Sequence, residues 1–334
     1  MPHITIKDVA SFAGVSVGTA SMALNDSPKI SESTRKKVWE VARKLDFSKN
    51  PYARSLSLNQ SKTIGFLVTD LRNPYFGEMA GYLQDEINAR GYSLMLGMCH
   101  ESIAQQKMLA ENFVNNGIDG MIVVPVAQKN PDLTHIYRLL ERKFPLVFIS
   151  GYYQGLSSNC IMSDLRKGSY ELTKYLLETG RTHIVMITGQ QDLVPSRERI
   201  AGMEQAYAEE GLELKPDQLY EAAALGLHAG YAATKEILAR GRPDAITAIN
   251  DILSMGVLNF LHEASISIPD GIAVAGYDDL EFSRILETPL TTVRQPLQQM
   301  CHESVDLLFR LMNGGMPEKE PVRLSPALIV RASS

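Results

Sequence analysis

The sequence around Ser16 has the spacing of a nucleophilic serine. In "GVSVG" this serine lies in the pattern G-x-S-x-G, which presents a serine hydroxyl at a strand-to-helix turn in α/β-hydrolases. Such a turn requires a buried strand before the serine and earlier strands that build the sheet. Here only fifteen residues precede Ser16, and Val9, Ala10 and Ala13 recur at helical spacing. We therefore reject the hydrolase interpretation.

Other catalytic and metal chemistries lack the residue patterns they require. No G-x-G-x-x-G follows an expected strand, and the sequence contains no P-loop. Cys99, Cys160 and Cys301 lie far apart without a C-x-x-C pair, and we expect them to be small core residues. The seven histidines show no metal-ligand spacing. We expect no enzymatic activity, no cofactor and no metal site.

The stretch around Ser16 fits two short helices joined by a tight turn. Thr5 is expected to cap the first helix, Gly14 to reverse the chain, and Ser16 to cap a second helix over residues 17–24. A third helix is expected after Ser31, where four apolar residues recur at i, i+3, i+4 and i+7. These elements predict a helix-turn-helix, a minimal DNA-reading domain.

The charge of the chain is distributed unevenly. Residues 1–62 carry ten lysines and arginines against five acidic residues, a net charge of +5, whereas the whole chain has a formal net charge of −5. The remaining residues therefore carry a net charge of −10. A small basic head on a large acidic body is typical of a DNA-binding module joined to a sensor or an enzyme.

The body, from Thr63 onward, alternates short apolar runs with helical patterns. Such alternation predicts parallel strands covered by helices on both faces, an α/β doubly wound fold. Seven or more strands are expected, in two sheets. The runs expected to form strands are "TIGFLV", "SLMLGM", "GMIVVP", "PLVFIS", "HIVMITG", "AITAIN" and "GIAVAGY".

Three quoted stretches carry a specific family resemblance. "ITIKDVASFAGVSVGTASMALN", "SESTRKKVWEVARKLDFSKNPYARSL" and "KTIGFLVTDLRNPYFGEMAGYLQ" are similar to the lactose-repressor (LacI/GalR) family of bacterial transcription regulators, over essentially the whole chain. The resemblance implies an all-α head and hinge helix before a two-lobed, periplasmic-binding-protein-like body. The implied divisions are a helix-turn-helix domain (1–48), a hinge helix and linker (49–62), an effector-binding and dimerisation domain (63–334), lobe one (about 63–162 and 293–320) and lobe two (about 163–290 and 321–334).

For DNA, the resemblance implies a homodimer on a near-palindromic operator. Recognition helices would enter adjacent major grooves, and paired hinge helices would order in the minor groove with Leu56 wedged into the central base step. A hinge helix this short is marginal by itself in water. The residues implied to contact DNA are Thr5, Ser16, Val17, Gly18, Thr19, Ser21, Met22, Asn25, Asn50, Tyr52, Ala53, Arg54 and Leu56.

The recognition helix departs from the family where bases are read. Val17, Gly18 and Met22 stand where many relatives have longer polar side chains and, at the third position, an arginine. Apolar contact with thymine methyl groups then remains, together with phosphate anchoring and DNA deformation. We expect modest half-site specificity and a strong dependence on the central step.

For the effector, the resemblance implies a cleft at the carboxyl ends of the strands, where ligands of doubly wound sheets bind. The implied effector-binding residues are Asp70, Asn73, Phe76, Asp164, Arg197, Leu225, Asn250, Asp278 and Gln295. Planar side chains suit adjacent sugar hydroxyls, and an aromatic face covers a sugar ring. Leu225 and Ser150 depart from the family, since relatives often have an aromatic and an acidic residue there.

These features favour a repressor of carbohydrate-utilisation genes controlled by a sugar-like effector. The alternative is a regulator that responds to a purine or a sugar phosphate as corepressor. The N-terminus has no apolar run flanked by basic residues, so we expect a cytoplasmic protein without a membrane partner. A free solute-binding protein for import is disfavoured because it would need a secretory signal and no basic head.

Overall fold

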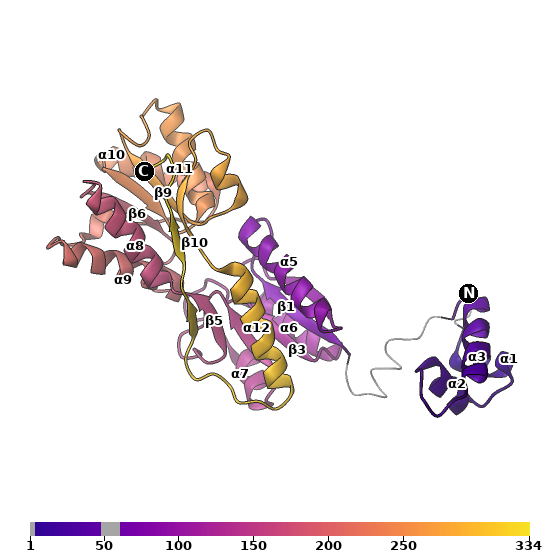
Figure 1. Cartoon of the computed structure of the whole chain (residues 1–334). Helices are drawn as coiled ribbons and strands as arrows, with labels where there is room; N and C mark the ends of the chain where they lie inside the picture. The colour runs from indigo at the N-terminus through magenta and orange to yellow at the C-terminus, as the bar shows by residue number, and fades with distance from the viewer. Residues whose placement is uncertain (1–3, 48–60) are drawn as a thin grey trace. The chain divides into compact units, whose positions relative to one another are not determined.

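The structure, a computed structural model, describes residues 4–47 and 61–334 (Figure 1). The chain divides between Ser61 and Lys62 into two compact units, a head and a body. The sequence predicts a body that begins at residue 63, one residue after the observed division.

The head consists of three helices whose ends follow from their capping residues. Asp8 accepts hydrogen bonds from the backbone N and the Oγ1 of Thr5, both at 2.7 Å. Gly14 reverses the chain with φ 62° and ψ 39°, a conformation that favours glycine. Ser16 Oγ accepts a hydrogen bond from Thr19 N at 3.1 Å. The helices are α1 (Ile6–Ala13), α2 (Val17–Leu24) and α3 (Glu32–Lys44).

The head core is small and rich in alanine. Because alanine carries only a methyl group, three helices can approach closely enough to exclude water in fewer than fifty residues. The fully buried apolar residues are Val9, Ala10, Ala13, Ala20, Ala23, Leu24, Val38 and Ala42. The expected core residues Val15, Val41 and Leu45 pack against them and stay partly exposed.

Two six-stranded sheets form the body, one in each lobe. Their strand orders are β11-β5-β4-β3-β1-β2 in lobe one and β12-β10-β9-β8-β6-β7 in lobe two. All ladders are parallel except that between β10 and β12. The lobe-one strands are β1 (Thr63–Val68), β2 (Ser93–Met98), β3 (Gly120–Val123), β4 (Leu146–Ile149), β5 (Cys160–Ser163) and β11 (Val322–Leu324). The lobe-two strands are β6 (Ile184–Thr188), β7 (Leu219–Glu221), β8 (Ala245–Ala248), β9 (Ala273–Asp278), β10 (Thr291–Arg294) and β12 (Ala327–Ile329).

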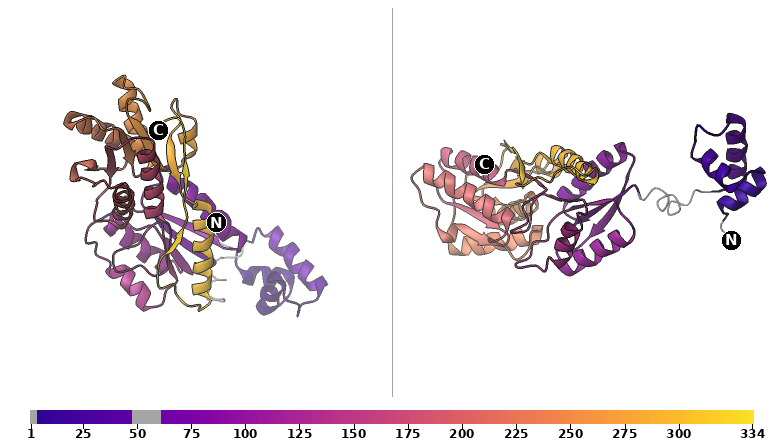
Figure 2. Two further views of the ribbon diagram at one scale, coloured as in Figure 1. Left: turned by 60° about the vertical axis from the view of Figure 1, so that its left-hand side comes forward. Right: turned by 90° about the horizontal axis from the view of Figure 1, so that it is seen from below.

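Helices cover both faces of each sheet, because the strands are apolar on both faces. In β1, Ile64, Phe66 and Val68 pack toward α5 and α12, which lie side by side in Figures 1 and 2, whereas Leu67 packs toward α6 and α7. The lobe-one helices are α5 (Pro74–Ala89), α6 (Ile103–Asn115), α7 (Thr134–Glu141) and α12 (Leu297–Met312). The lobe-two helices are α8 (Leu165–Glu178), α9 (Val194–Glu209), α10 (Leu227–Arg240), α11 (Asp251–Glu263), η1 (Pro216–Gln218) and η2 (Glu281–Arg284).

The chain passes between the lobes three times: from β5 to α8, from β10 to α12, and from β11 to β12. The last two crossings lie later than expected. β10 at residues 291–294 belongs to the second sheet, and β11 at residues 322–324 pairs with β5 in the first. The resemblance therefore placed these two crossings a few residues too early, because the short strands β10 and β11 each continue a sheet up to the crossing.

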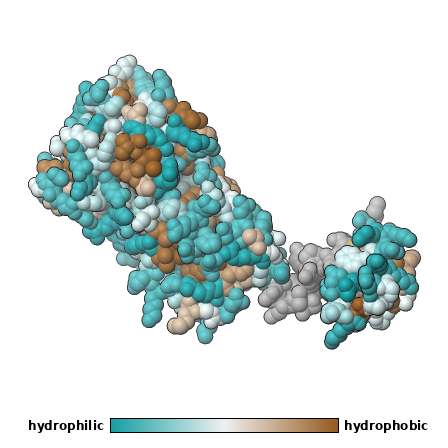
Figure 3. Space-filling view, in the orientation of Figure 1, coloured by the Kyte–Doolittle hydropathy of each residue, from teal (hydrophilic) through white to brown (hydrophobic). Residues whose placement is uncertain are grey.

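In the part of the chain that the structure describes, no helix combines the length and apolarity needed to cross a membrane. The face of the molecule in Figure 3 is mostly hydrophilic, with a few separate apolar patches.

Helices α10 and α11 touch through glycines. A Cβ at Gly230 would collide with the backbone oxygen of Leu253, and one at Gly256 with that of Leu227. Backbone atoms cannot give way as flexible side chains do, so these two helices pack at a distance that only glycine permits.

We expect Gly230→Ala to destabilise the body by about 1–3 kcal/mol through this overpacking. Gly81→Ala is the matched control: Gly81 is also helical, a Cβ there would meet no atom within 4 Å, and alanine should stabilise the helix by about 0.5–1 kcal/mol. Urea unfolding of the full chain measures both changes. Equal effects of the two substitutions would contradict the close helix contact.

Candidate functional site

The exposed face of α2 is apolar. Val17 is 43% and Met22 38% exposed, and Gly18 between them is exposed as well. The helix "VGTASMAL" contains no lysine, arginine, asparagine or glutamine, the side chains that form bidentate contacts with guanine or adenine. This face can therefore contact bases mainly through methyl and methylene groups.

The polar residues expected at the DNA lie around this face, and two of them are occupied by capping. Ser16 Oγ binds Thr19 N and lies 2.9 Å from Thr19 Oγ1, and Thr5 donates to Asp8. Helix N-terminal amides are themselves phosphate donors, so the start of α2 can still anchor DNA. Ser21 is partly buried and Asn25 exposed. Asn50, Tyr52, Ala53, Arg54 and Leu56 lie outside the described residues.

A cavity of about 1180 Å³ separates the two lobes of the body, where the carboxyl ends of both sheets face each other. Most of the residues predicted from the sequence line this cavity. Those that do are Asn73, Phe76, Arg197, Leu225, Asn250, Asp278 and Gln295. They lie at or after the carboxyl ends of β1, β6, β7, β8, β9 and β10, in loops, in the first turns of α5 and α9, and at the last residue of β9.

Asp70 and Asp164, also predicted, are not among the lining residues. Asp70 pairs with Arg72 at 2.7 Å, and this contact holds the pKa of Asp70 below its usual value. Asp164 caps α8 by accepting a hydrogen bond from Lys167 N at 3.0 Å. Both carboxylates follow strands, Asp70 after β1 and Asp164 after β5, but their hydrogen bonds are made locally rather than in the cleft.

Asp278 is the carboxyl group at the centre of the cleft. Gln295 Nε2 donates a hydrogen bond to its Oδ1 at 2.7 Å. Burial raises the pKa of Asp278 well above its usual value, the nearby Asp251 carboxylate raises it further, and the Arg199 guanidinium opposes this shift. Hydrogen-bond donors of a ligand would favour the ionised carboxylate and lower this pKa.

Four buried polar atoms of cavity-lining residues have no hydrogen-bond partner among the described residues. They are Thr69 Oγ1, Gln190 Oε1, Arg199 Nε and Gln295 Oε1. An unsatisfied buried polar group costs about 1–3 kcal/mol, so a ligand that brought hydrogen-bonding groups within reach of these atoms would stabilise the body.

Arg199 is the main residue that our sequence analysis missed. Its guanidinium stacks on Tyr277, 4.0 Å from the ring centre, and its Nη1 donates to Pro195 O at 3.0 Å. The signal was present in α9: Ser196, Arg199 and Ile200 share the i, i+3, i+4 spacing of the buried face, whereas Arg197 is exposed.

The remaining cleft wall combines aromatic, aliphatic and hydroxyl groups. Tyr75 OH lies 3.2 Å from Ser150 Oγ, with Phe76 beside it at a ring-centre distance of 5.3 Å. Asn250 is committed within the protein, since its Nδ2 donates to Leu225 O at 3.1 Å and its Oδ1 accepts from Leu253 N at 2.7 Å. Asn250 therefore positions Leu225 rather than offering both amide groups to a ligand.

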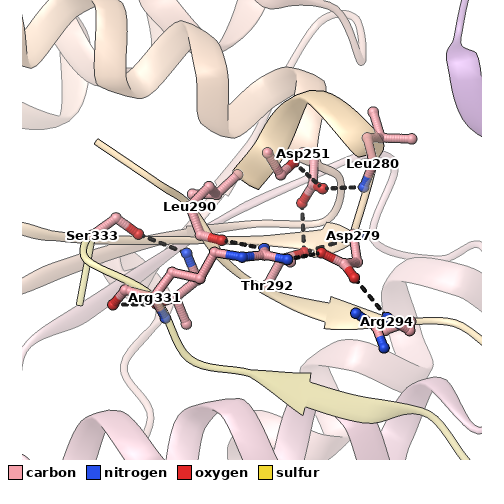
Figure 4. Close-up of polar contacts among 10 residues, drawn as sticks. Asp251, Asp279, Leu280, Leu290, Thr292, Arg294, Arg331 and Ser333 are labelled. Atoms are coloured by element: carbon pink, nitrogen blue, oxygen red, sulfur yellow. Dashed lines mark hydrogen bonds and ion pairs between the residues drawn. The ribbon is translucent and has the colours of Figure 1, made fainter. Parts of the chain in front are cut away.

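A charged network holds the turn that carries Asp278 (Figure 4). Asp279 accepts hydrogen bonds from Arg294 Nε at 2.6 Å and from Arg331 Nη2 at 2.5 Å. The fully buried Asp251 accepts from Leu280 N at 2.8 Å and, through its other oxygen, from the Thr292 hydroxyl at 2.6 Å. The turn between β9 and η2 is thus fixed from two sides, although Asp278 and Asp279 both adopt positive φ.

Residues 4–47 and 61–334 contain no group of three or more His, Cys, Asp or Glu side chains arranged to hold a metal ion. The fold and the site together define a class of protein in which a helix-turn-helix head is joined to a two-lobed ligand-binding body.

Comparison with known proteins agrees with this class. Residues 5–50 match "Bacterial regulatory proteins, lacI family", and residues 173–334 match "Periplasmic binding protein-like domain". The HTH-type transcriptional repressor PurR of Aliivibrio fischeri (strain MJ11) is 32% identical over 333 residues, covering 98% of each chain. The ribose operon repressor of Escherichia coli (strain K12) is 31% identical over 333 residues, covering 99% of each. The chain belongs to the LacI family of bacterial transcription regulators.

Solved structures show the same fold. The Lac repressor dimer bound to operator and the anti-inducer ONPF matches with a TM-score of 0.88 over 99% of each chain, at 24% identity. The transcriptional regulator CelR in complex with cellobiose matches with a TM-score of 0.75, at 26% identity, over 99% of this chain and 100% of CelR. The two-lobed, doubly wound body expected from the sequence is confirmed.

Asp251→Asn keeps the side-chain size and cannot ionise. Burial raises the pKa of Asp251 from its usual 3.8 to about 6, so the folded protein binds this proton more tightly than the unfolded chain. We expect the free energy of unfolding of the wild type, relative to that of the variant, to decrease by at most about 3 kcal/mol from pH 4 to pH 6. At higher pH the difference should remain constant. Urea unfolding of both proteins from pH 4 to 8 measures this difference. A difference that does not change with pH would contradict the raised pKa of Asp251.

Proposed function

We propose that this protein is a cytoplasmic repressor that binds a near-palindromic operator as a homodimer, without enzymatic activity. Its relatives are named as repressors, and the Lac repressor structure contains a dimer on its operator. The observation that carries control by a small molecule is the set of four unpartnered polar atoms around the cleft.

The cleft favours a hydroxyl-rich effector such as a carbohydrate. Gln190 Oε1, Gln295 Oε1 and the Asp278 carboxyl are acceptors, while Arg199 Nε is a donor. Adjacent hydroxyl groups can donate to the first three and accept from the last, and Phe76 offers an apolar face to a ring. The regulated genes would then serve carbohydrate use, as in the ribose operon that one relative controls by name.

A purine corepressor is the second candidate. The relatives named PurR favour it, and so do the adjacent rings of Tyr75 and Phe76 at the cavity wall. An amide such as Gln190 can also pair with the edge of a base.

Control of DNA by the effector follows from coupling between two equilibria. A ligand that binds better between closed lobes shifts the body toward closure. Closure changes the spacing of the two segments (residues 49–62) that lead to the heads of a dimer, and thereby their ability to fold together on DNA. These residues lie mostly outside the described ranges, so this step is part of the proposal.

The effector can be identified with a thermal-shift panel of D-ribose, cellobiose, glucose 6-phosphate and hypoxanthine. We expect a hydroxyl-bearing effector to release the Asp278 proton when it binds, because the hydrogen-bond donors of the effector favour the ionised carboxylate. Affinity should rise with pH by up to about tenfold per unit until the free protein is itself ionised. Calorimetry from pH 5 to 8 measures this rise, which Asp278→Asn should abolish. Stabilisation by hypoxanthine alone would refute the carbohydrate effector.

Base reading by α2 can be tested on operators selected from genomic fragments at physiological salt. Replacing thymine by uracil removes the methyl group and should weaken wild-type binding by about 0.8 kcal/mol per contacted methyl. Val17→Ala/Met22→Ala should be insensitive to the same replacement, and uracil outside the half-sites is the control. Equal losses of binding free energy in the wild type and the variant would contradict recognition of thymine methyl groups by α2. Losses above about 3 kcal/mol when guanines facing α2 are replaced would contradict it as well.

A further inference from the structure

An ion pair joins the two lobes across the mouth of the cleft. Lys129 Nζ lies 2.7 Å from Asp192 Oδ2, and both residues line the cavity. Lys129 follows β3 of lobe one, and Asp192 follows β6 of lobe two. In the strand orders, β3 lies two strands from the crossing strand β5, and β6 lies three strands from β10. The pair therefore lies away from the side on which the chain crosses.

Lobe one holds Lys129 on a braced segment, residues 124–133. Val126 N donates to Tyr153 OH at 2.9 Å, and Ala127 N donates to Glu101 Oε2 at 2.9 Å. Tyr153 OH in turn donates to the buried Gln106 Oε1 at 2.9 Å. Side chains from three other elements thus fix the start of the segment, so it moves with lobe one.

Lobe two braces Asp192 in a comparable way. Gln191 N donates to Glu221 Oε2 at 3.2 Å, and Leu193 N donates to Gln190 O at 3.2 Å. Glu221 also faces Lys129: together with Asp192, it raises the pKa of the lysine above its usual value. The lysine of lobe one therefore meets two acidic side chains of lobe two.

The crossing side carries its own ion pair between the lobes. Arg323 of β11 binds Glu198 of α9 through two parallel contacts of 3.0 and 3.3 Å. Rotation of the lobes about the three crossings would largely keep this contact, because it lies beside the axis. The same rotation would separate Lys129 from Asp192.

We propose that Lys129 and Asp192 form a gate of the cleft: the pair holds the mouth closed and breaks when a ligand enters or leaves. This role rests on the proposed effector function of the cleft. The two side chains are 52% and 69% exposed, so their attraction is partly screened by solvent. A change of about two- to fivefold in the ratio of open to closed molecules is the expected effect of breaking such a pair.

Distances between spin labels in the full chain can measure this ratio. The three native cysteines are buried, and Met108→Cys in lobe one and Leu212→Cys in lobe two provide exposed labelling sites. Into this background we would place Lys129→Asp, Asp192→Lys and the double charge exchange. The matched control is Glu32→Lys, which breaks an exposed ion pair with Lys36 inside α3 of the head.

We expect each single charge reversal to shift molecules toward longer distances two- to fivefold. The double exchange should return the distribution toward that of the wild type, although not completely, because Glu221 then faces an aspartate at position 129. Glu32→Lys should have no effect. In 1 M salt the wild type should shift in the same direction as the single variants but less far, because screening removes the attraction without adding a repulsion between like charges. Unchanged distances in the single variants, or a double exchange that stays open, would overturn the gate.

The thermal-shift panel separates this inference from the effector function. If a panel compound stabilises the protein while the distances ignore the charge reversals, the gate is refuted and the effector function stands. If the distances respond as expected while none of D-ribose, cellobiose, glucose 6-phosphate and hypoxanthine stabilises any variant, the pair does close the lobes, and the effector function fails for these compound classes.

Discussion

The function of the body depends on one constraint: the carboxyl ends of the parallel strands in its two sheets face each other across the cleft. Loops that follow parallel strands cannot extend the ladder, so their polar groups must find partners elsewhere. Asp278, Gln190 and Gln295 lie at such ends, on strands or loops that are themselves held by buried contacts. The three chain crossings lie toward one edge of each sheet, which leaves the opposite side of the interface free to open.

Long, strongly patterned elements could be predicted from the sequence. The bounds of α2 and the seven apolar strands follow from capping residues and continuous apolar runs. The strands β5, β7, β10, β11 and β12 have three or four residues and were not among the seven expected runs, since so short a run carries little periodicity and pairing in the sheet stabilises it. Asp70, which follows a predicted strand, and Asp164, which the family resemblance implied, do not line the cleft, because local partners decide where such side chains point.

The head illustrates how far residue types alone can specify recognition. The serine and glycine that imitate a hydrolase pattern are explained as a helix cap and a chain reversal, because Ser16 accepts from Thr19 N and Gly14 has positive φ. The surface left exposed on α2 then contains Val17 and Met22 rather than hydrogen-bonding side chains. We propose that such a surface discriminates bases weakly and that the energetic cost of deforming the operator carries more of the specificity.

The relative sizes of two effects decide what controls the lobes. An exposed ion pair such as Lys129–Asp192 contributes about 0–1 kcal/mol, whereas each buried polar atom left without a partner costs about 1–3 kcal/mol. A ligand that satisfies Thr69, Gln190, Arg199 and Gln295 together therefore outweighs the gate several times over. In this proposal, a bound ligand dominates the equilibrium between open and closed lobes, whereas the ion pair at the mouth biases the same equilibrium when no ligand is bound.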